Sequence, residues 1–150
     1  MKNAIRKRVL AAIIVAVSAT AVGAQSAPAV AVFKRATCGC CAKWVDHVRA
    51  SGFAPTATDV DDLNAVKSKH NVPQALHSCH TALVGGYVIE GHVPAADIRR
   101  LLKERPAIVG LAVPGMPAGS PGMEGPPPQK YDVLAFDKQG KTRVYATHGN

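Results

Sequence analysis

Three cysteines stand within four residues of the sequence, at Cys38, Cys40 and Cys41. The residues before them, 27–37, have the apolar pattern of a strand, and those from about 40 to 50 repeat their apolar positions at helical spacing. The cysteines therefore lie where a strand ends and a helix begins. The free N–H groups and partial positive charge of a helix's first turn favour a thiolate over a thiol. Because packing does not require three thiols in one loop, this junction predicts a chemical role for them.

The rest of the chain predicts an α/β domain, in which helices pack on a small mixed sheet. After the first helix, which Gly52 ends, the predicted elements are a strand over 53–60, a helix over 61–72, two strands within 80–93, a helix from Pro94 to Pro106 and two strands within 131–147. Asp59 or Asp61 is the expected cap of the second helix, and Gly85-Gly86 is the expected hairpin turn. Residues 113–128 are too rich in Gly and Pro for regular structure. We therefore expect a flanked sheet, a Gly/Pro-rich loop and a C-terminal β-hairpin.

The first 24 residues predict a signal peptide. A basic start that includes Lys2 and Arg6 precedes an apolar run over 9–22, and Ala24 follows at a position that suits cleavage. The run is short for a membrane-spanning helix, which needs roughly 20 apolar residues. We expect export to a bacterial periplasm without a stable membrane anchor, and a single mature domain over 25–150.

The charge of the chain does not indicate nucleic-acid binding. Its formal net charge is +8, but the predicted leader carries four of the 18 Lys and Arg residues and none of the 10 acidic ones, which leaves +4. The remaining basic residues are scattered among acids, and aromatic residues are few. Nucleic-acid binding needs a concentrated basic face, often with stacking aromatics, so this class of function is excluded.

A fourth cysteine, Cys79, also lies in the predicted mature domain. In an exported protein an even number of cysteines commonly forms structural disulfides. However, a bridge between the adjacent Cys40 and Cys41 is strained, and a Cys38–Cys41 bridge closes so small a loop that it restrains the unfolded chain little. Structural disulfides therefore explain the spacing poorly, and they remain the weakest of three interpretations.

The two other interpretations are redox catalysis and metal binding. A strand, a C-G-x-C sequence and a helix resemble the active-site corner of the thioredoxin fold, which implies that Cys79 folds back to the same corner. A thiol–disulfide oxidoreductase acting on protein substrates needs only two of the four thiols. Four clustered thiolates instead suit Cu(I), or less selectively Zn(II), and crowded sulfurs can bridge several Cu(I) ions. We therefore favour a soft-metal site formed by Cys38, Cys40, Cys41 and Cys79.

Further candidate ligands surround these cysteines in the sequence. His47 follows on the same helix, and His80 adjoins Cys79; imidazole binds copper and zinc. Met116 and Met123 lie in the Gly/Pro-rich loop, and their thioethers become candidates only if that loop covers the cysteines. Trp44 shares the helix face but is expected to belong to the core.

Three stretches together resemble one family. They are "TCGCCAKWVDHV", "SCHTALVGGYVIEGHVPAADIRRLL" and "GLAVPGMPAGSPGME", and they are similar to the CopG-type periplasmic copper-resistance proteins. The resemblance implies a thioredoxin-like fold, copper held by the four cysteines, and a role in copper tolerance by sequestration, by transfer to other periplasmic copper-handling proteins, or by Cu(I)/Cu(II) redox chemistry. Some relatives carry additional metal-binding tails; because no such tail is seen at "YATHGN", we do not expect a second site of that kind.

Overall fold

The computed structural model describes residues 26–125 and 127–149 of the chain. The elements are β1 (Ala29–Lys34), α1 (Gly39–Ala50), β2 (Ala54–Asp59), α2 (Leu63–Lys69), the short 3-10 helix η1 (Gln74–Leu76), β3 (His80–Val84), β4 (Tyr87–Glu90), α3 (Ala95–Glu104), β5 (Gly110–Ala112), β6 (Tyr131–Phe136) and β7 (Thr142–His148). The predicted signal peptide lies outside the described residues, so the bounds of the mature domain stay a prediction. Among the helices in the described ranges, none has the length and apolarity to cross a bilayer.

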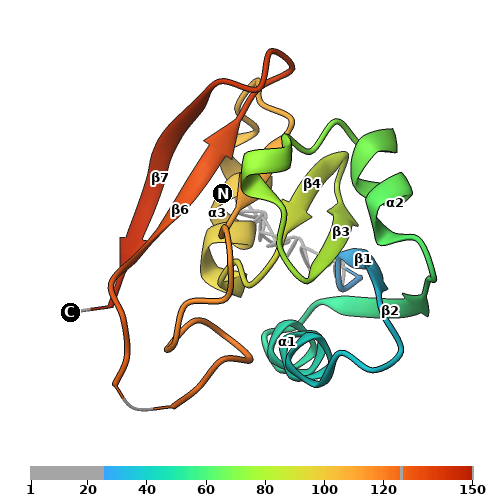
Figure 1. The fold of residues 1–150 in the computed structure, drawn as a ribbon. Helices are drawn as coiled ribbons and strands as arrows, with labels where there is room; N and C mark the ends of the chain where they lie inside the picture. The colour runs from blue at the N-terminus through green and yellow to red at the C-terminus, as the bar shows by residue number, and fades with distance from the viewer. Residues whose placement is uncertain (1–25, 126, 150) are drawn as a thin grey trace, which may run out of the picture.

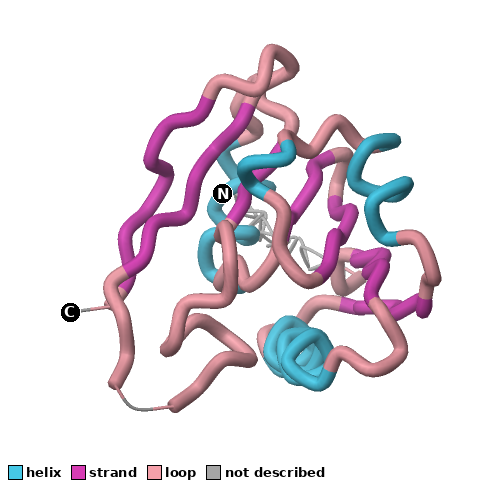
Figure 2. The backbone as a smooth tube through the Cα atoms, viewed as in Figure 1, coloured by secondary structure: helices cyan, strands magenta, loops and turns pink. Residues whose placement is uncertain are grey.

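The strands form one seven-stranded mixed sheet in the order β2-β1-β3-β4-β5-β6-β7 (Figures 1 and 2). The β1–β2 and β4–β5 pairs are parallel, and the other neighbouring pairs are antiparallel. The predicted α/β class and the order β-α-β-α-β-β-α are therefore confirmed, as is the C-terminal hairpin. The finer assignment to the thioredoxin fold stays a prediction.

Apolar side chains pack on both faces of the sheet. One face carries the larger core, to which α1 contributes Trp44 and Val48 and α3 contributes Ile98 and Leu101. Figure 1 shows α3 behind the sheet. The other face carries a smaller cluster built from the segment after α2 and from alternate residues of the same strands. The members of this cluster are Val72, Leu76, Val88, Ala112 and Phe136.

The residues that the pattern places in the core are buried. In β1, Val30 and Val32 are each 1% exposed, since alternate side chains of a strand point to the same face. In α1, the stripe of Cys41, Val45 and Val48 faces the sheet together with Trp44. The expectation that Trp44 is a core residue is confirmed, and its Nε1–H donates to the Val93 carbonyl over 2.9 Å.

Two local expectations are wrong. The cap of α2 is Asp62, whose Oδ1 accepts from the Ala65 N–H over 3.0 Å, and not Asp59 or Asp61. A cap must directly precede the first helical residue, and three nearby aspartates made the pattern ambiguous.

The strand β5 was not predicted at all. Its Gly110 lies so close to β4 that a Cβ would overlap the Val88 carbonyl, so close backbone approach and not side-chain pattern creates this strand.

Candidate metal centre

The pairing of β1 with β3 brings two distant parts of the chain to one corner. Lys34, the last residue of β1, pairs with His80, the first residue of β3, in antiparallel register. The end of β1 and the start of β3 therefore lie side by side at the same end of the sheet. Cys38 is the N-cap of α1, and the other two cysteines of its loop occupy the first turn. Cys79 directly precedes β3, so it lies beside that loop.

All four sulfur atoms meet at this corner. The Sγ atoms of Cys38, Cys40, Cys41 and Cys79 all lie within 4.8 Å of one another. Cys40 Sγ lies 3.5 Å from Cys38 Sγ and 4.0 Å from Cys79 Sγ. Cys41 Sγ is fully buried and lies 3.5 Å from the Cys79 carbonyl oxygen. The arrangement has the compactness that a thiolate metal site requires.

Two of the four sulfurs are bonded to each other. Cys38 and Cys41 form a disulfide with a Cα–Cα distance of 5.3 Å, and Cys40 and Cys79 are free. This differs from the expectation of four thiolates, because the structure describes the oxidised state of the C-x-x-C pair. The helical turn places residues three apart on one side, where their sulfurs can bond. Reduction by two electrons converts this corner into one with four thiols.

Cys79 also contacts two imidazoles, one of which sequence reasoning missed. Its Sγ lies 2.8 Å from His92 Nε2 and 3.4 Å from His80 Nδ1. The three donor atoms lie within 4.8 Å of one another, and both histidines are 0% exposed. His80 was a candidate from its position next to Cys79, whereas His92 was not placed near the site.

The β3–β4 hairpin explains why His92 lies there. The turn at Gly85 and Gly86 pairs Val84 with Tyr87, and each step outward pairs the next two residues, as far as Thr81 with Glu90. Two further steps along the same register put Cys79 opposite His92. The signal was therefore present in the sequence, because a two-residue turn sets the register of a hairpin.

The protonation states of this group follow from burial. Burial lowers the pKa of His92, against smaller raising effects of its hydrogen bond to the Pro121 carbonyl and of Glu124. His92 Nδ1 lies 2.8 Å from that carbonyl oxygen. A carbonyl only accepts, so Nδ1 carries the proton and the Nε2 lone pair faces Cys79. Burial, followed by the charge and hydrogen bond of Cys40, raises the pKa of the Cys79 thiol to about 12. The pair is therefore a neutral thiol next to a neutral imidazole.

His80 is the most enclosed of these groups. Burial first, then the neighbouring His92 and Lys67, lowers the pKa of His80 well below its usual value. Its ring centroid lies 4.4 Å from that of Trp44 and 5.2 Å from that of His92. Within residues 26–125 and 127–149, His80 Nε2 is the buried side-chain nitrogen that has no hydrogen-bond partner. A neutral imidazole keeps a lone pair for a metal ion.

The Gly/Pro-rich loop between β5 and β6 covers the corner; in Figure 1 it is the orange segment that approaches α1. Met116 Sδ lies 4.0 Å from Cys40 Sγ, and Met116 is 51% exposed. A Cβ on Gly122, which has φ +89°, would come within 2.7 Å of the Cys40 carbonyl oxygen and 2.9 Å of the Trp44 nitrogen. Only glycine allows this approach without strain. Met116 therefore lies close enough to the cysteines to remain a candidate ligand.

A buried ionic network holds the chain next to Cys79. Glu90 Oε1 accepts from Lys67 Nζ over 2.5 Å and from the Ser78 N–H over 2.6 Å. Thr81 Oγ1 donates to Glu90 Oε2 over 2.7 Å. The side chains of Lys67 and Glu90 are 3% and 0% exposed. The network anchors the backbone directly before Cys79, and nothing in the sequence pattern predicted it.

The structure does not bring His47 to the cysteines. Its Nε2 accepts from the Ala95 N–H over 3.1 Å, so it satisfies a free donor at the start of α3. Burial lowers the pKa of His47, against a smaller raising effect of Glu124, which keeps the ring neutral and able to accept. This hydrogen bond gives His47 a structural role.

Two surface hollows flank the cysteines. One, of about 270 Å³, reaches Cys38 and Cys79 beside α2. The other, of about 480 Å³, lies between α1 and the Gly/Pro-rich loop and reaches Cys40, Met123 and Glu124. The centre is therefore covered but open to small solutes on two sides, and Met123 lines one of the approaches.

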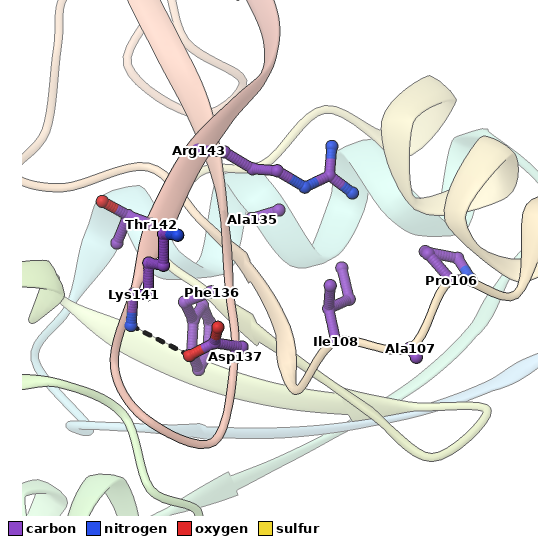
Figure 3. A pocket seen from close by; sticks show the side chains of 9 residues that line it. All are labelled: Pro106, Ala107, Ile108, Ala135, Phe136, Asp137, Lys141, Thr142 and Arg143. Carbon is purple, nitrogen blue, oxygen red and sulfur yellow. Dashed lines mark hydrogen bonds between the residues drawn. The ribbon is translucent and has the colours of Figure 1, made fainter.

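A third hollow lies at the other end of the sheet (Figure 3). It has a volume of about 290 Å³ and lies between residues 106–108 and the β6–β7 hairpin. At its rim the Lys141 backbone N–H donates to Asp137 Oδ1 over 2.9 Å. None of its nine lining residues is a cysteine, histidine or methionine, so it offers no soft ligand.

Known proteins share the fold, and a family model matches the segment that contains Cys79. The family model described as "Protein of unknown function, DUF411" matches residues 76–123. A solved structure of copper resistance protein CopG, Form 2, is 45% identical, with a TM-score of 0.78, over 82% of this chain and 99% of that chain. The chain belongs to the CopG family of copper resistance proteins.

A second CopG structure, Form 1, is 46% identical, with a TM-score of 0.77, over 81% of this chain and 98% of that chain. The α/β fold described above therefore matches CopG structures over nearly their whole length, and the resemblance seen in the sequence is confirmed. No curated protein matches the chain significantly.

Proposed function

We propose that the protein is an exported, periplasmic copper-binding protein that holds Cu(I) through the reduced thiolates of Cys38, Cys40, Cys41 and Cys79. The observation that carries the proposal is the meeting of these four sulfur atoms within 4.8 Å. They come from two segments 38 residues apart, and the register of β1 with β3 brings them together. Membership of a copper resistance family supports copper as the ion.

The chemistry of the donors supports Cu(I) over harder ions. Thiolates and thioethers select Cu(I), whereas magnesium and calcium prefer oxygen ligands. Met116 Sδ, at 4.0 Å from Cys40 Sγ, adds a soft donor on the exposed side. Sulfurs this close together can bridge ions, so we propose more than one Cu(I) per chain, with Zn(II) as the alternative ion for the thiolates.

The disulfide defines what loading requires. An external dithiol must supply two electrons and two protons to the Cys38–Cys41 bond, and it leaves as a disulfide. Four thiols then stand at the corner, and Cu(I) displaces their protons. We propose three possible roles for the loaded protein. It would sequester copper, pass it to another periplasmic copper-handling protein, or cycle copper between Cu(I) and Cu(II) at the partly exposed centre.

An anaerobic titration tests the proposal. Reduced protein is titrated with Cu(I) against a chromogenic Cu(I) chelator, and X-ray absorption of the loaded protein reports sulfur and copper neighbours. We expect tight retention that Cys40→Ser and Cys79→Ser weaken strongly. Ser68→Ala, on the exposed side of α2, serves as the control and should retain copper as the wild type does. Equal retention by all four proteins would refute the four-thiolate site.

A second candidate function is thiol–disulfide exchange with protein substrates. One observation favours it: the Cys38–Cys41 disulfide lies at the N-terminus of α1, where a thiolate is stabilised. Against it, free Cys40 lies only 3.5 Å from Cys38 Sγ and would compete for any mixed disulfide.

The two functions respond differently to one substitution. An exchange mechanism does not use Cys40, so Cys40→Ser should keep insulin-reductase activity in metal-free protein and Cys38→Ser should abolish it. Copper retention has the opposite dependence on Cys40. If metal-free protein reduces insulin and Cys40→Ser binds copper normally, the exchange enzyme replaces the copper site as the function.

A further inference from the structure

We propose that Cys79, His80 and His92 form a second metal subsite, of one thiolate and two imidazoles, which takes a divalent ion of borderline softness such as Zn(II). The inference goes beyond the Cu(I) site, because none of its three ligands belongs to the Cys38–Cys41 disulfide. The subsite therefore exists in the oxidised protein, in which a four-thiolate site cannot form.

Geometry is the first support. The donor atoms of the three residues lie within 4.8 Å of one another, with Cys79 Sγ at 2.8 Å from His92 Nε2 and 3.4 Å from His80 Nδ1. One thiolate and two imidazoles are ligands that zinc commonly takes, with a fourth position left for another donor. Free Cys40, whose Sγ lies 4.0 Å from Cys79 Sγ, is a candidate donor for that fourth position.

The surroundings of His92 are the second support. A metal-bound histidine usually donates its other ring N–H to a carbonyl or carboxylate, which sets the tautomer and aims the free nitrogen at the ion. His92 has this arrangement before any ion is bound, since its Nδ1–H donates to the Pro121 carbonyl over 2.8 Å. The Gly/Pro-rich loop thus orients a ligand in addition to covering the cysteines.

The burial of both rings is the third support. Both histidines are 0% exposed, yet each directs one ring nitrogen at Cys79 Sγ, His92 through Nε2 and His80 through Nδ1. Histidine is a common metal ligand through either ring nitrogen. Two buried imidazoles that face one sulfur are explained by coordination better than by packing.

Binding is balanced by the release of one proton. The ion replaces the hydrogen on Cys79 Sγ, and the two imidazoles bind through lone pairs. No electron is transferred, and the disulfide stays intact. Because Cys79 also belongs to the four-sulfur group, its thiolate would bridge the two subsites after reduction.

The test uses protein purified without reductant, with the Cys38–Cys41 disulfide verified by thiol counting and mass. Anaerobic Co(II) titration should give ligand-field and sulfur-to-cobalt bands that saturate at one ion per chain and vanish on addition of Zn(II). His92→Gln and Cys79→Ser should each weaken Zn(II) binding by more than the roughly 10–100-fold that loss of an outer-shell partner causes. His70→Gln, on the C-cap of α2, is the matched control and should bind as the wild type does.

X-ray absorption of the Zn(II)-loaded wild type is independent of whether the variants fold. Mixed nitrogen and sulfur neighbours are expected. Absence of Co(II) and Zn(II) binding to oxidised protein, all-sulfur coordination, or unchanged affinity in folded His92→Gln would each overturn the subsite. Cu(I) retention by reduced protein is measured separately, so failure of the copper proposal leaves this result intact, and the reverse also holds.

Discussion

Replacement of Lys67 by methionine tests whether the buried ionic network holds the metal centre. Lys67 Nζ lies 2.5 Å from Glu90 Oε1, and the two side chains are 3% and 0% exposed. Methionine keeps much of the apolar stem and removes only the charge and its hydrogen bonds. The Glu90 carboxylate would then retain the Ser78 N–H and the Thr81 hydroxyl as donors, but no cation.

The expected loss is large because water cannot replace the missing cation. Removal of one partner of a buried ion pair costs about 3–5 kcal/mol. A domain of this size loses roughly 3–4 °C in Tm for each kcal/mol, so the expected fall is about 10–20 °C. The Ser78–Cys79 backbone should also move, because Glu90 holds it, and Cu(I) retention should weaken. Replacement of both partners, Lys67→Met with Glu90→Gln, should recover much of the stability, since no uncompensated charge remains.

Urea denaturation followed by circular dichroism measures the free energy of unfolding. Lys69→Met, two residues along the same helix, is the control: this lysine is exposed, and its replacement should change stability by no more than about 0.5 kcal/mol. If Lys67→Met costs no more than Lys69→Met, the ion pair does not stabilise the fold and the reasoning about this corner is wrong.

Three further outcomes are expected. Oxidised protein should bind fewer Cu(I) ions than protein whose Cys38–Cys41 disulfide has been reduced; equal stoichiometry by metal analysis would contradict the role given to these thiols. Gly122→Ala should destabilise the fold by about 1–3 kcal/mol in thermal denaturation, because φ is +89° and the Cβ would meet a carbonyl oxygen of α1 at 2.7 Å; a change within about 0.5 kcal/mol would show that the loop adapts. Burial lowers the pKa of His47, so its neutral form stabilises the folded state above pH 6.5, and this stability is lost as pH falls through the lowered pKa. His47→Gln, which can still accept from Ala95, should lose less stability than the wild type between pH 7 and 5, and parallel losses would refute the assignment.

Much of the fold was predictable from local patterns. The stripe of Cys41, Val45 and Val48 indicated which face of α1 is buried, and Gly85-Gly86 indicated the hairpin. The short strand β5 was not predictable in this way. It contains only three residues, begins at Gly110, and forms because β4 and β6 both hydrogen-bond to it. Side-chain periodicity carries no information about such a strand, since three residues are too few to show a period.

The candidate metal site likewise contains residues that the sequence predicts and residues that it does not. Cys38, Cys40, Cys41 and Cys79 could be named from their spacing and chemistry. His92 could have been found by extending the hairpin register from Val84–Tyr87, but that step requires knowing that the register continues without a bulge. The Lys67–Glu90 pair could not be found, because it joins residues 23 apart through the packing of α2 on β3 and β4.

By itself, the sequence determined the apolar faces, the turns, and the presence of sulfur ligands where a strand meets a helix, since these depend on neighbours within a few residues. The tertiary structure alone decided that Cys38 is bonded to Cys41, that Cys40 and Cys79 remain free, and that the Gly/Pro-rich loop closes over them and holds His92 through the Pro121 carbonyl. The physical reason is that ångström-scale distances between side chains depend on strand pairing and packing between segments tens of residues apart, and a local pattern does not contain them.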